Sequence, residues 1–165
     1  MMKQSCLTLI ALITGVLIPG TALGDIAIDP LRFFVGATEC VGTLKVVIRK
    51  AVATHTIGQG EITADGSLTL VQRVEGEGRQ QHIRRWLIRP VAPGHFAGTM
   101  SDAVGPVTID QVGDRYRFRF KMKDSISVEE WLTPLPGGKS ATSSMTARKF
   151  GFAVASSQGT IRKIS

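Results

Sequence analysis

Polar and apolar side chains alternate without interruption between residues 115 and 123. The basic residues share one parity: Arg115, Arg117, Arg119, Lys121 and Lys123. The other parity is apolar: Tyr116, Phe118, Phe120 and Met122. Because successive side chains of a β-strand point to opposite faces, this segment is predicted to be a strand with one wet face and one apolar face. The opposite facing would bury cations without partners, so we expect the aromatic side chains to point inward.

Similar short runs, rich in β-branched residues, fill most of the remaining chain and are separated by turn sequences such as Asp65-Gly66, Pro93-Gly94 and Gly113-Asp114. The predicted strands cover residues 42–50, 54–64, 67–74, 80–89, 95–100, 107–112, 115–123, 126–132, 140–148 and 152–165. No window of helical length shows a 3.6-residue period, which indicates an all-β domain. Consecutive hairpins favour an antiparallel meander that closes into a barrel of about 8–10 strands. The apolar segment 31–35 is expected to lie across one end of the barrel.

The first 24 residues have the pattern of a secretory signal peptide. Lys3 precedes an uncharged apolar stretch from residue 7 to residue 18, and Ala22 and Gly24 supply small residues before the expected cleavage site. We therefore expect a single mature domain, residues 25–165, that begins at Asp25 and is periplasmic or secreted. The apolar run is short for a bilayer-spanning anchor, so no transmembrane span is expected after its removal.

Charge and cysteine content limit the possible partners. The net charge is +7, and removal of residues 1–24 takes away Lys3 and no acid, which leaves +6. A basic surface is compatible with an anionic envelope surface as a partner, or simply with solubility. Cys40 would be the only cysteine of the mature chain, so an internal disulfide is excluded; its apolar surroundings favour a buried, inert thiol.

Several short motifs occur in an order that is similar to one bacterial family. They are Phe33 to Gly36, Asp65-Gly66 with Leu68 to Leu70, Arg84 to Trp86, Gly94 to Gly105, Glu129 to Trp131, and Met145 to Phe152. Together they resemble the family called domain of unknown function 3833. The resemblance implies an exported, lipocalin-like (calycin-type) β-barrel and implies no activity.

Two acidic positions are candidates for the interior or mouth of the barrel. Asp102, in the loop sequence MSDAVG, is either an acid at the barrel mouth or a residue that holds its own loop by hydrogen bonds. Glu129 and Glu130 must face opposite sides of their strand; the inward one would need a partner such as Arg84 or Arg85, as a ligand-orienting group or a structural latch. The candidate ligand-binding residues are Trp86, Asp102, Tyr116, Phe118, Phe120, Glu130 and Trp131.

The sequence lacks the patterns of the common catalytic and metal sites. His55, His82 and His95 have no partner at metal-ligand spacing, and the segment between His95 and Asp102 is a strand long enough to keep these two side chains apart. The serines at 140, 143 and 144 lack a Gly-x-Ser-x-Gly elbow, and no phosphate-binding loop is present. Nucleic acid is an unexpected partner, because the aromatic and basic side chains of residues 115–120 face opposite ways. No cofactor or metal is expected.

Two functions remain from this pattern. The first is an exported, non-enzymatic barrel that binds a small apolar or amphipathic ligand in its interior or mouth. The second is a structural or interaction module of the cell envelope whose barrel is filled and holds no ligand. Large inward residues at one level of every strand would indicate a filled barrel, whereas small ones would leave a cavity.

Overall fold

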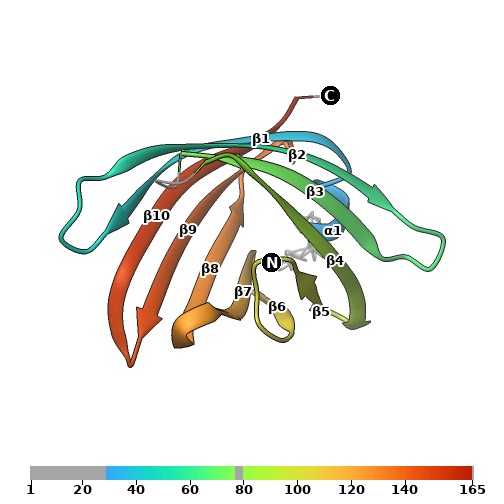
Figure 1. The fold of residues 1–165 in the computed structure, drawn as a ribbon. Coiled ribbons are helices and arrows are strands. Elements are labelled where there is room, and N and C mark those ends of the chain that lie inside the picture. Colours follow the sequence, from blue (N-terminus) through green and yellow to red (C-terminus); the bar gives the residue numbers. More distant parts are fainter. Residues whose placement is uncertain (1–28, 77–79, 165) are drawn as a thin grey trace, which may run out of the picture.

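The computed structural model describes residues 29–76 and 80–164 and contains one short α-helix followed by ten strands, with one 3-10 turn, η1 (Lys123–Ser125), between two of the strands (Figure 1). The helix is α1 (Pro30–Phe33). The strands are β1 (Gly36–Val46), β2 (Val52–Ile62), β3 (Leu68–Glu75), β4 (His82–Ala92), β5 (His95–Met100), β6 (Val107–Val112), β7 (Arg115–Met122), β8 (Ile126–Pro134), β9 (Ser140–Lys149) and β10 (Phe152–Lys163). The segments predicted to be strands are all strands.

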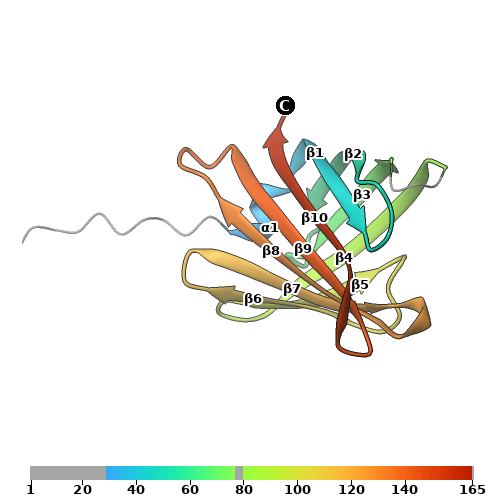
Figure 2. The same cartoon turned by 90° about the vertical axis from the view of Figure 1, so that its left-hand side faces the viewer.

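Each strand pairs antiparallel with its neighbours in the sequence, and β1 pairs with β10 to close the barrel (Figure 2). The predicted all-β, antiparallel meander is therefore confirmed as a closed barrel of ten strands. The main difference lies at the start, because β1 begins at Gly36 instead of residue 42. The signal peptide predicted for residues 1–24 lies outside the described residues. Within the described residues, no helix is long and apolar enough to cross a membrane.

Helix α1 closes one end of the barrel, as expected for the apolar segment 31–35. The Asp29 carboxylate accepts a hydrogen bond from the Leu31 amide at 2.9 Å, and Pro30 occupies the first turn, where its missing N–H is not needed. Leu31 and Phe33 are buried in the main core cluster. Gly60 allows this fit, since a Cβ at that position would lie 2.1 Å from the Phe34 carbonyl oxygen.

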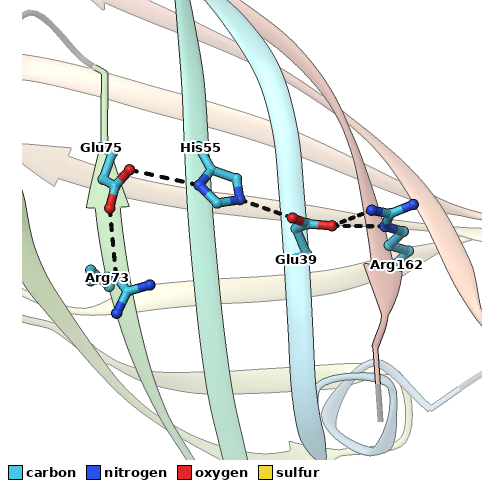
Figure 3. A network of polar contacts seen from close by, with 5 residues as sticks. All are labelled: Glu39, His55, Arg73, Glu75 and Arg162. Carbon is cyan, nitrogen blue, oxygen red and sulfur yellow. Dashed lines mark hydrogen bonds and ion pairs between the residues drawn. The ribbon is translucent and has the colours of Figure 1, made fainter.

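A network of charged residues crosses the outside of the barrel where its first and last strands meet (Figure 3). Arg162 on β10 donates to Glu39 on β1 at 2.8 Å, and the other Glu39 oxygen lies 2.9 Å from His55 on β2. His55 is 3.7 Å from Glu75 on β3, which is 3.5 Å from Arg73. The hydrogen bonds from His55 and Arg162 lower the pKa of Glu39. Single exposed ion pairs stabilise a protein little, but this chain of contacts links four neighbouring strands across the closure.

The facing predicted for β7 is confirmed. Tyr116 and Phe118 are buried, whereas Arg115 and Arg119 are exposed. Arg117 is an intermediate case: its side chain is 32% exposed, lies over the Trp131 ring and is 3.6 Å from Asp110. The outward face of β7 is therefore partly covered by its own aromatic and acidic neighbours.

Candidate ligand-binding site in the open half of the barrel

Burial of the inward-facing side chains changes along the barrel axis. Topology places α1 and the β2–β3, β4–β5, β6–β7 and β8–β9 connections at one end, and the other connections at the opposite end. Inward residues near α1 are buried: Leu68, Leu70, Ile88, Ile109, Tyr116, Leu132 and Ile161. Further along the same or adjacent strands, many inward residues are only half-buried: Leu44, Thr54, Thr56, Gln72, Arg84, Phe120, Met122, Met145 and Ser157. Other inward residues of that part remain buried: Val74, Met100, Val107, Val128 and Ala147. The interior is thus packed near α1 and partly accessible to solvent at the other end, which we call the open half.

Small residues form one side of this interior. On β1, β2, β9 and β10 most inward positions at mid-height are small: Cys40, Gly42, Thr56, Gly58, Ser143 and Gly159. Ser157 is also small, but its inward partners on the neighbouring strands are Met145 and Leu44. The inward positions of β4 and β7 instead carry Trp86, Phe118 and Phe120. By the criterion derived from the sequence, large residues do not occupy this level on every strand, which favours an interior that is not filled throughout.

Three aromatic rings separate the packed half from the open half. The Trp86 ring meets Phe118 edge-to-face at 6.4 Å between ring centroids and Phe120 at 6.0 Å. The Trp86 indole N–H donates to Gln72 Oε1 at 2.7 Å, so the polar atom of this largely buried ring is satisfied. Trp86 and Phe118 are buried and Phe120 is half-buried, which places Phe120 on the side of the opening.

A polar cluster lies at the mouth of the open half. Arg84 Nε donates to Asp102 Oδ2 at 2.8 Å, His82 Nε2 is 3.2 Å from the same oxygen, and Ser101 Oγ donates to Asp102 Oδ1 at 2.9 Å. Burial alone would raise the pKa of Asp102, but the hydrogen bond and charge of Arg84, with the bonds from Ser101 and His82, hold it below its ordinary value. Asp102 is therefore an ionised group at the mouth that is tied to strand β4.

Glu130 faces inward, as one of the two neighbouring glutamates was predicted to do. Its carboxylate accepts a hydrogen bond from Ser143 Oγ at 2.5 Å. The Cys40 thiol also faces this part of the interior and packs against the core, although it is half-buried and not fully buried as expected. Burial, followed by the negative charge of Glu130, raises the pKa of Cys40 to about 11. The thiol is accordingly protonated near neutral pH.

Two of the candidate ligand-binding residues lie away from the others. Tyr116 is buried in the packed half, and burial together with the charge of Asp29 raises its pKa. Trp131 is on the outside of the barrel, where Arg115 lies 4.5 Å from its ring centroid. Trp86, Asp102, Phe118, Phe120 and Glu130 line the open half, its floor or its mouth. The facing of Trp131 thus removes it from the candidate lining, and Tyr116 lies below the floor.

Sequence reasoning missed His82 and Arg84 as members of the mouth cluster. The alternation of side chains along the strand could have identified them, because residues 82, 84 and 86 must share a face of β4 and Trp86 was expected to face inward. His95, by contrast, contacts Asp110 at 2.9 Å and is not near Asp102, in agreement with the argument from strand length. Among residues 29–76 and 80–164, no three His, Cys, Asp or Glu side chains form a group suited to a metal ion.

Two shallow grooves also follow the strands. Each has a volume of about 470 Å³; one crosses β1, β10 and β9, and the other crosses β3, β4 and β5. Six of the nine residues that line each groove have the outward parity, Val71 and Leu87 among them. The grooves therefore belong to the outer wall and are distinct from the open half.

Comparison with known proteins agrees with this fold. The S-type phycobiliprotein lyase CPES from Guillardia theta has a TM-score of 0.62 and 7% identity, over 82% of this chain and 90% of the lyase. A protein of unknown function from the DUF3598 family of Nostoc punctiforme has a TM-score of 0.63 and 10% identity, over 89% of this chain and 53% of that protein. At these identities the likeness shows a common lipocalin-like fold and nothing about residue roles.

No curated protein matches the sequence. A family model does match it, over residues 21–163, and its description is "Protein of unknown function (DUF3833)". The match covers nearly the whole chain, including every described strand. The chain therefore belongs to the DUF3833 family, as the order of its short motifs indicated.

Proposed function

We propose that this protein is an exported, non-enzymatic lipocalin-like barrel that binds a small apolar or amphipathic ligand in its open half. The observation that carries the proposal is the change of burial along the axis. Inward side chains are packed near α1, whereas toward the opposite end many, from Phe120 and Arg84 onward, are only half-buried beside buried ones such as Val74 and Val128. Small-molecule sites are typically concave, mainly apolar and supplied with a few placed polar groups, which is the composition found here.

The lining of the open half suits a molecule with two different ends. An apolar body can pack on Leu44, Phe120 and Met122, with Trp86 beneath it. A polar end would meet the mouth cluster, in which Asp102 holds Arg84 in place. Because this ion pair exists before a ligand enters, the ligand would lose little binding free energy in ordering these two side chains.

The protonation states of the interior residues support a binding role over catalysis. A general base works best when its pKa is near the working pH, yet the pKa of Asp102 is held below its ordinary range. A nucleophilic cysteine needs a lowered pKa, yet that of Cys40 is raised to about 11. A lyase shares the fold, but at 7% identity its activity is not transferred to this chain.

Export is proposed from the amino-terminal sequence. Lys3, the apolar run that follows it, and the small residues Ala22 and Gly24 together form the signal-peptide pattern. A chain with a cleaved signal of this kind would be delivered to the periplasm or outside the cell.

A contact quencher tests the ligand site, because the chain has two tryptophans on opposite sides of the wall. In the W131F variant the remaining fluorescence comes from Trp86 at the floor; in the W86F variant it comes from Trp131 outside. The probe is 12-bromododecanoic acid, whose bromine quenches an indole only on contact, with dodecanoic acid as the unbrominated control. We expect saturable quenching in W131F and none in W86F.

A pair of neighbouring substitutions separates interior binding from surface adsorption. Ser157 faces inward and is half-buried, whereas the adjacent Gln158 faces outward and is exposed. In the W131F background, S157F should abolish the quenching by occupying the open half, and Q158F should leave it unchanged. Absence of quenching in W131F, or equal quenching in W86F, would favour the alternative of an envelope module without a ligand.

A further inference from the structure

The rim of the open half carries the three most exposed large apolar side chains of the described residues, Ile48, Phe150 and Phe152, with Val47 beside them. In the β1–β2 connection, Val47 is 51% exposed and Ile48 is 99% exposed. At the β9–β10 turn, Phe150 is 79% exposed and Phe152 is 77% exposed. We call these four residues the rim patch. Folding leaves them in water, although large apolar side chains are normally buried.

The two parts of the rim patch are neighbours in the fold. Strands β1 and β10 pair with each other up to Val46 and Ala155, and the Val47 amide donates to the Val154 carbonyl at 3.0 Å. Figure 1 shows the β1–β2 connection and the β9–β10 turn at the same end of the barrel, away from α1. The apolar side chains therefore project from adjoining hairpins.

Two members of the rim patch adopt a backbone conformation that disfavours them. Ile48 has φ of 69° and Phe150 has φ of 50°, both in the left-handed region. That region suits Gly or Asn, and a β-branched residue there is a clear outlier. Folding stability alone would thus favour a different residue at each of these positions, and both side chains remain largely exposed.

The ends of the two hairpins that carry the rim patch are basic and contain no acid. The sequence has no Asp or Glu from residue 40 to residue 60 or from residue 131 to residue 165. Cations flank the apolar side chains on both hairpins: Lys45, Arg49, Lys50, Arg148 and Lys149. The Lys149 ammonium lies 5.8 Å from the Phe150 ring centroid, so charge and apolar surface adjoin directly.

The acids of other strands at this end leave the basic character intact. Glu75 contacts Arg73 and His55, and Asp102 contacts Arg84. Asp124 in the β7–β8 connection follows Lys123 directly in the chain. Within the described residues, the rim therefore remains positively charged around its apolar side chains.

We propose that the rim patch docks on the surface of an anionic phospholipid bilayer. Exposed Phe and Ile side chains can enter the headgroup–acyl boundary, while Lys and Arg beside them attract the anionic headgroups. Peripheral membrane proteins use this combination of apolar burial and charge attraction, and either part alone binds weakly. Docking in this orientation would turn the open half of the barrel toward the lipid. The proposal rests on the rim alone and stands whether or not the open half holds a ligand.

Vesicle flotation of the mature protein tests this inference. The probes are vesicles of phosphatidylcholine alone and of phosphatidylcholine with phosphatidylglycerol, at low salt. We expect the protein to float with the anionic vesicles and to remain unbound with the neutral ones. Raising the salt to about 0.5 M should release most of it, because screening weakens attraction between exposed charges.

The variant I48N/F150N removes two of the four apolar side chains of the rim patch without harming the fold, since Asn tolerates positive φ better than Ile or Phe. It should float at least about tenfold less, with an unchanged or higher urea midpoint. The control V91N/V112N removes two exposed side chains, 56% and 40% exposed, from strand ends near α1 and should float like the wild type.

Three results would overturn the proposal. One is failure of the wild type to float with anionic vesicles, and another is equal flotation of the two double variants. A dimer that dissociates on the I48N/F150N substitution, seen by size-exclusion chromatography, would show instead that the rim patch joins two copies of the chain.

Discussion

Truncation of Phe118 to Ala tests the barrel core most sharply, since its ring belongs both to the packed interior and to the floor of the open half. The side chain is 6% exposed and meets Trp86 edge-to-face at 6.4 Å between centroids. Replacing a buried Phe by Ala costs about 3–5 kcal/mol of unfolding free energy, because burial is lost and a cavity remains. With a urea slope of about 2 kcal/mol/M, the midpoint should fall by about 1.5–2.5 M.

Two further variants, F120A and R117A, provide a comparison for the loss of unfolding free energy in F118A. Phe120 also contacts Trp86, at 6.0 Å, but is half-buried beside the opening, where water can replace its ring; F120A should cost about half as much as F118A. Arg117 contributes an ion pair and a cation–π contact, each worth about 0.2–1 kcal/mol at exposed sites. Its buried Nε has no hydrogen-bond partner, which offsets part of this gain.

We therefore expect R117A to cost less than about 1 kcal/mol, close to the sequence-based expectation for an outward residue of β7. The assay is urea unfolding of the purified mature protein, followed by tryptophan fluorescence and circular dichroism so that two-state behaviour is checked. Equal losses in F118A and R117A would refute the inward and outward assignment of this strand. A harmless F118A would refute the packed core itself.

Three other predictions follow from the same structure. Because the pKa of Asp102 is lowered, its ionised form should stabilise the fold above the ordinary carboxyl pKa of about 3.9, and this stabilisation should be lost as the pH falls below that value. Urea unfolding should show D102N less stable than the wild type at pH 7, with a smaller difference at pH 3; an equal difference at both pH values would contradict this. Cys40, with its pKa raised to about 11, should react slowly with a thiol reagent in native buffer at pH 7.5 and quickly in denaturant; rapid native labelling or a covalent dimer would argue against it. Amino-terminal sequencing of the exported protein should begin at Asp25, and a chain that retains Met1 would show that residues 1–24 are not a cleaved signal.

The fold was predictable where local patterns and global packing agree. On β7 the alternation of basic and aromatic residues predicts both the strand and its orientation, because the aromatic side chains are the ones that can be buried in the interior. The start of β1 was missed because its inward residues, Thr38 and Cys40, are small and give no apolar alternation. They are placed by pairing with Lys163 and Ile161 of β10, more than a hundred residues away, which no local pattern contains.

The candidate site was only partly predictable for a similar reason. Asp102 and Arg84 meet because the β4–β5 hairpin pairs Trp86 with Met100, which brings the residues after β5 beside the start of β4. That register depends on a bulge between Pro90 and Ala92, so counting back from the Pro93-Gly94 turn does not yield it. The outward orientation of Trp131 could have been predicted from the sequence, because an inward Glu130 already requires its neighbour to face outward.

Native mass spectrometry of the mature protein, purified from the compartment to which it is exported, tests the central claim most directly. The account predicts the mass of residues 25–165 together with a discrete small adduct that leaves on collisional activation, can be extracted and identified, and is missing from S157F but present in Q158F. A spectrum with the bare polypeptide alone, under activation gentle enough to preserve non-covalent complexes, would contradict the account and show that the open half of the barrel carries no ligand.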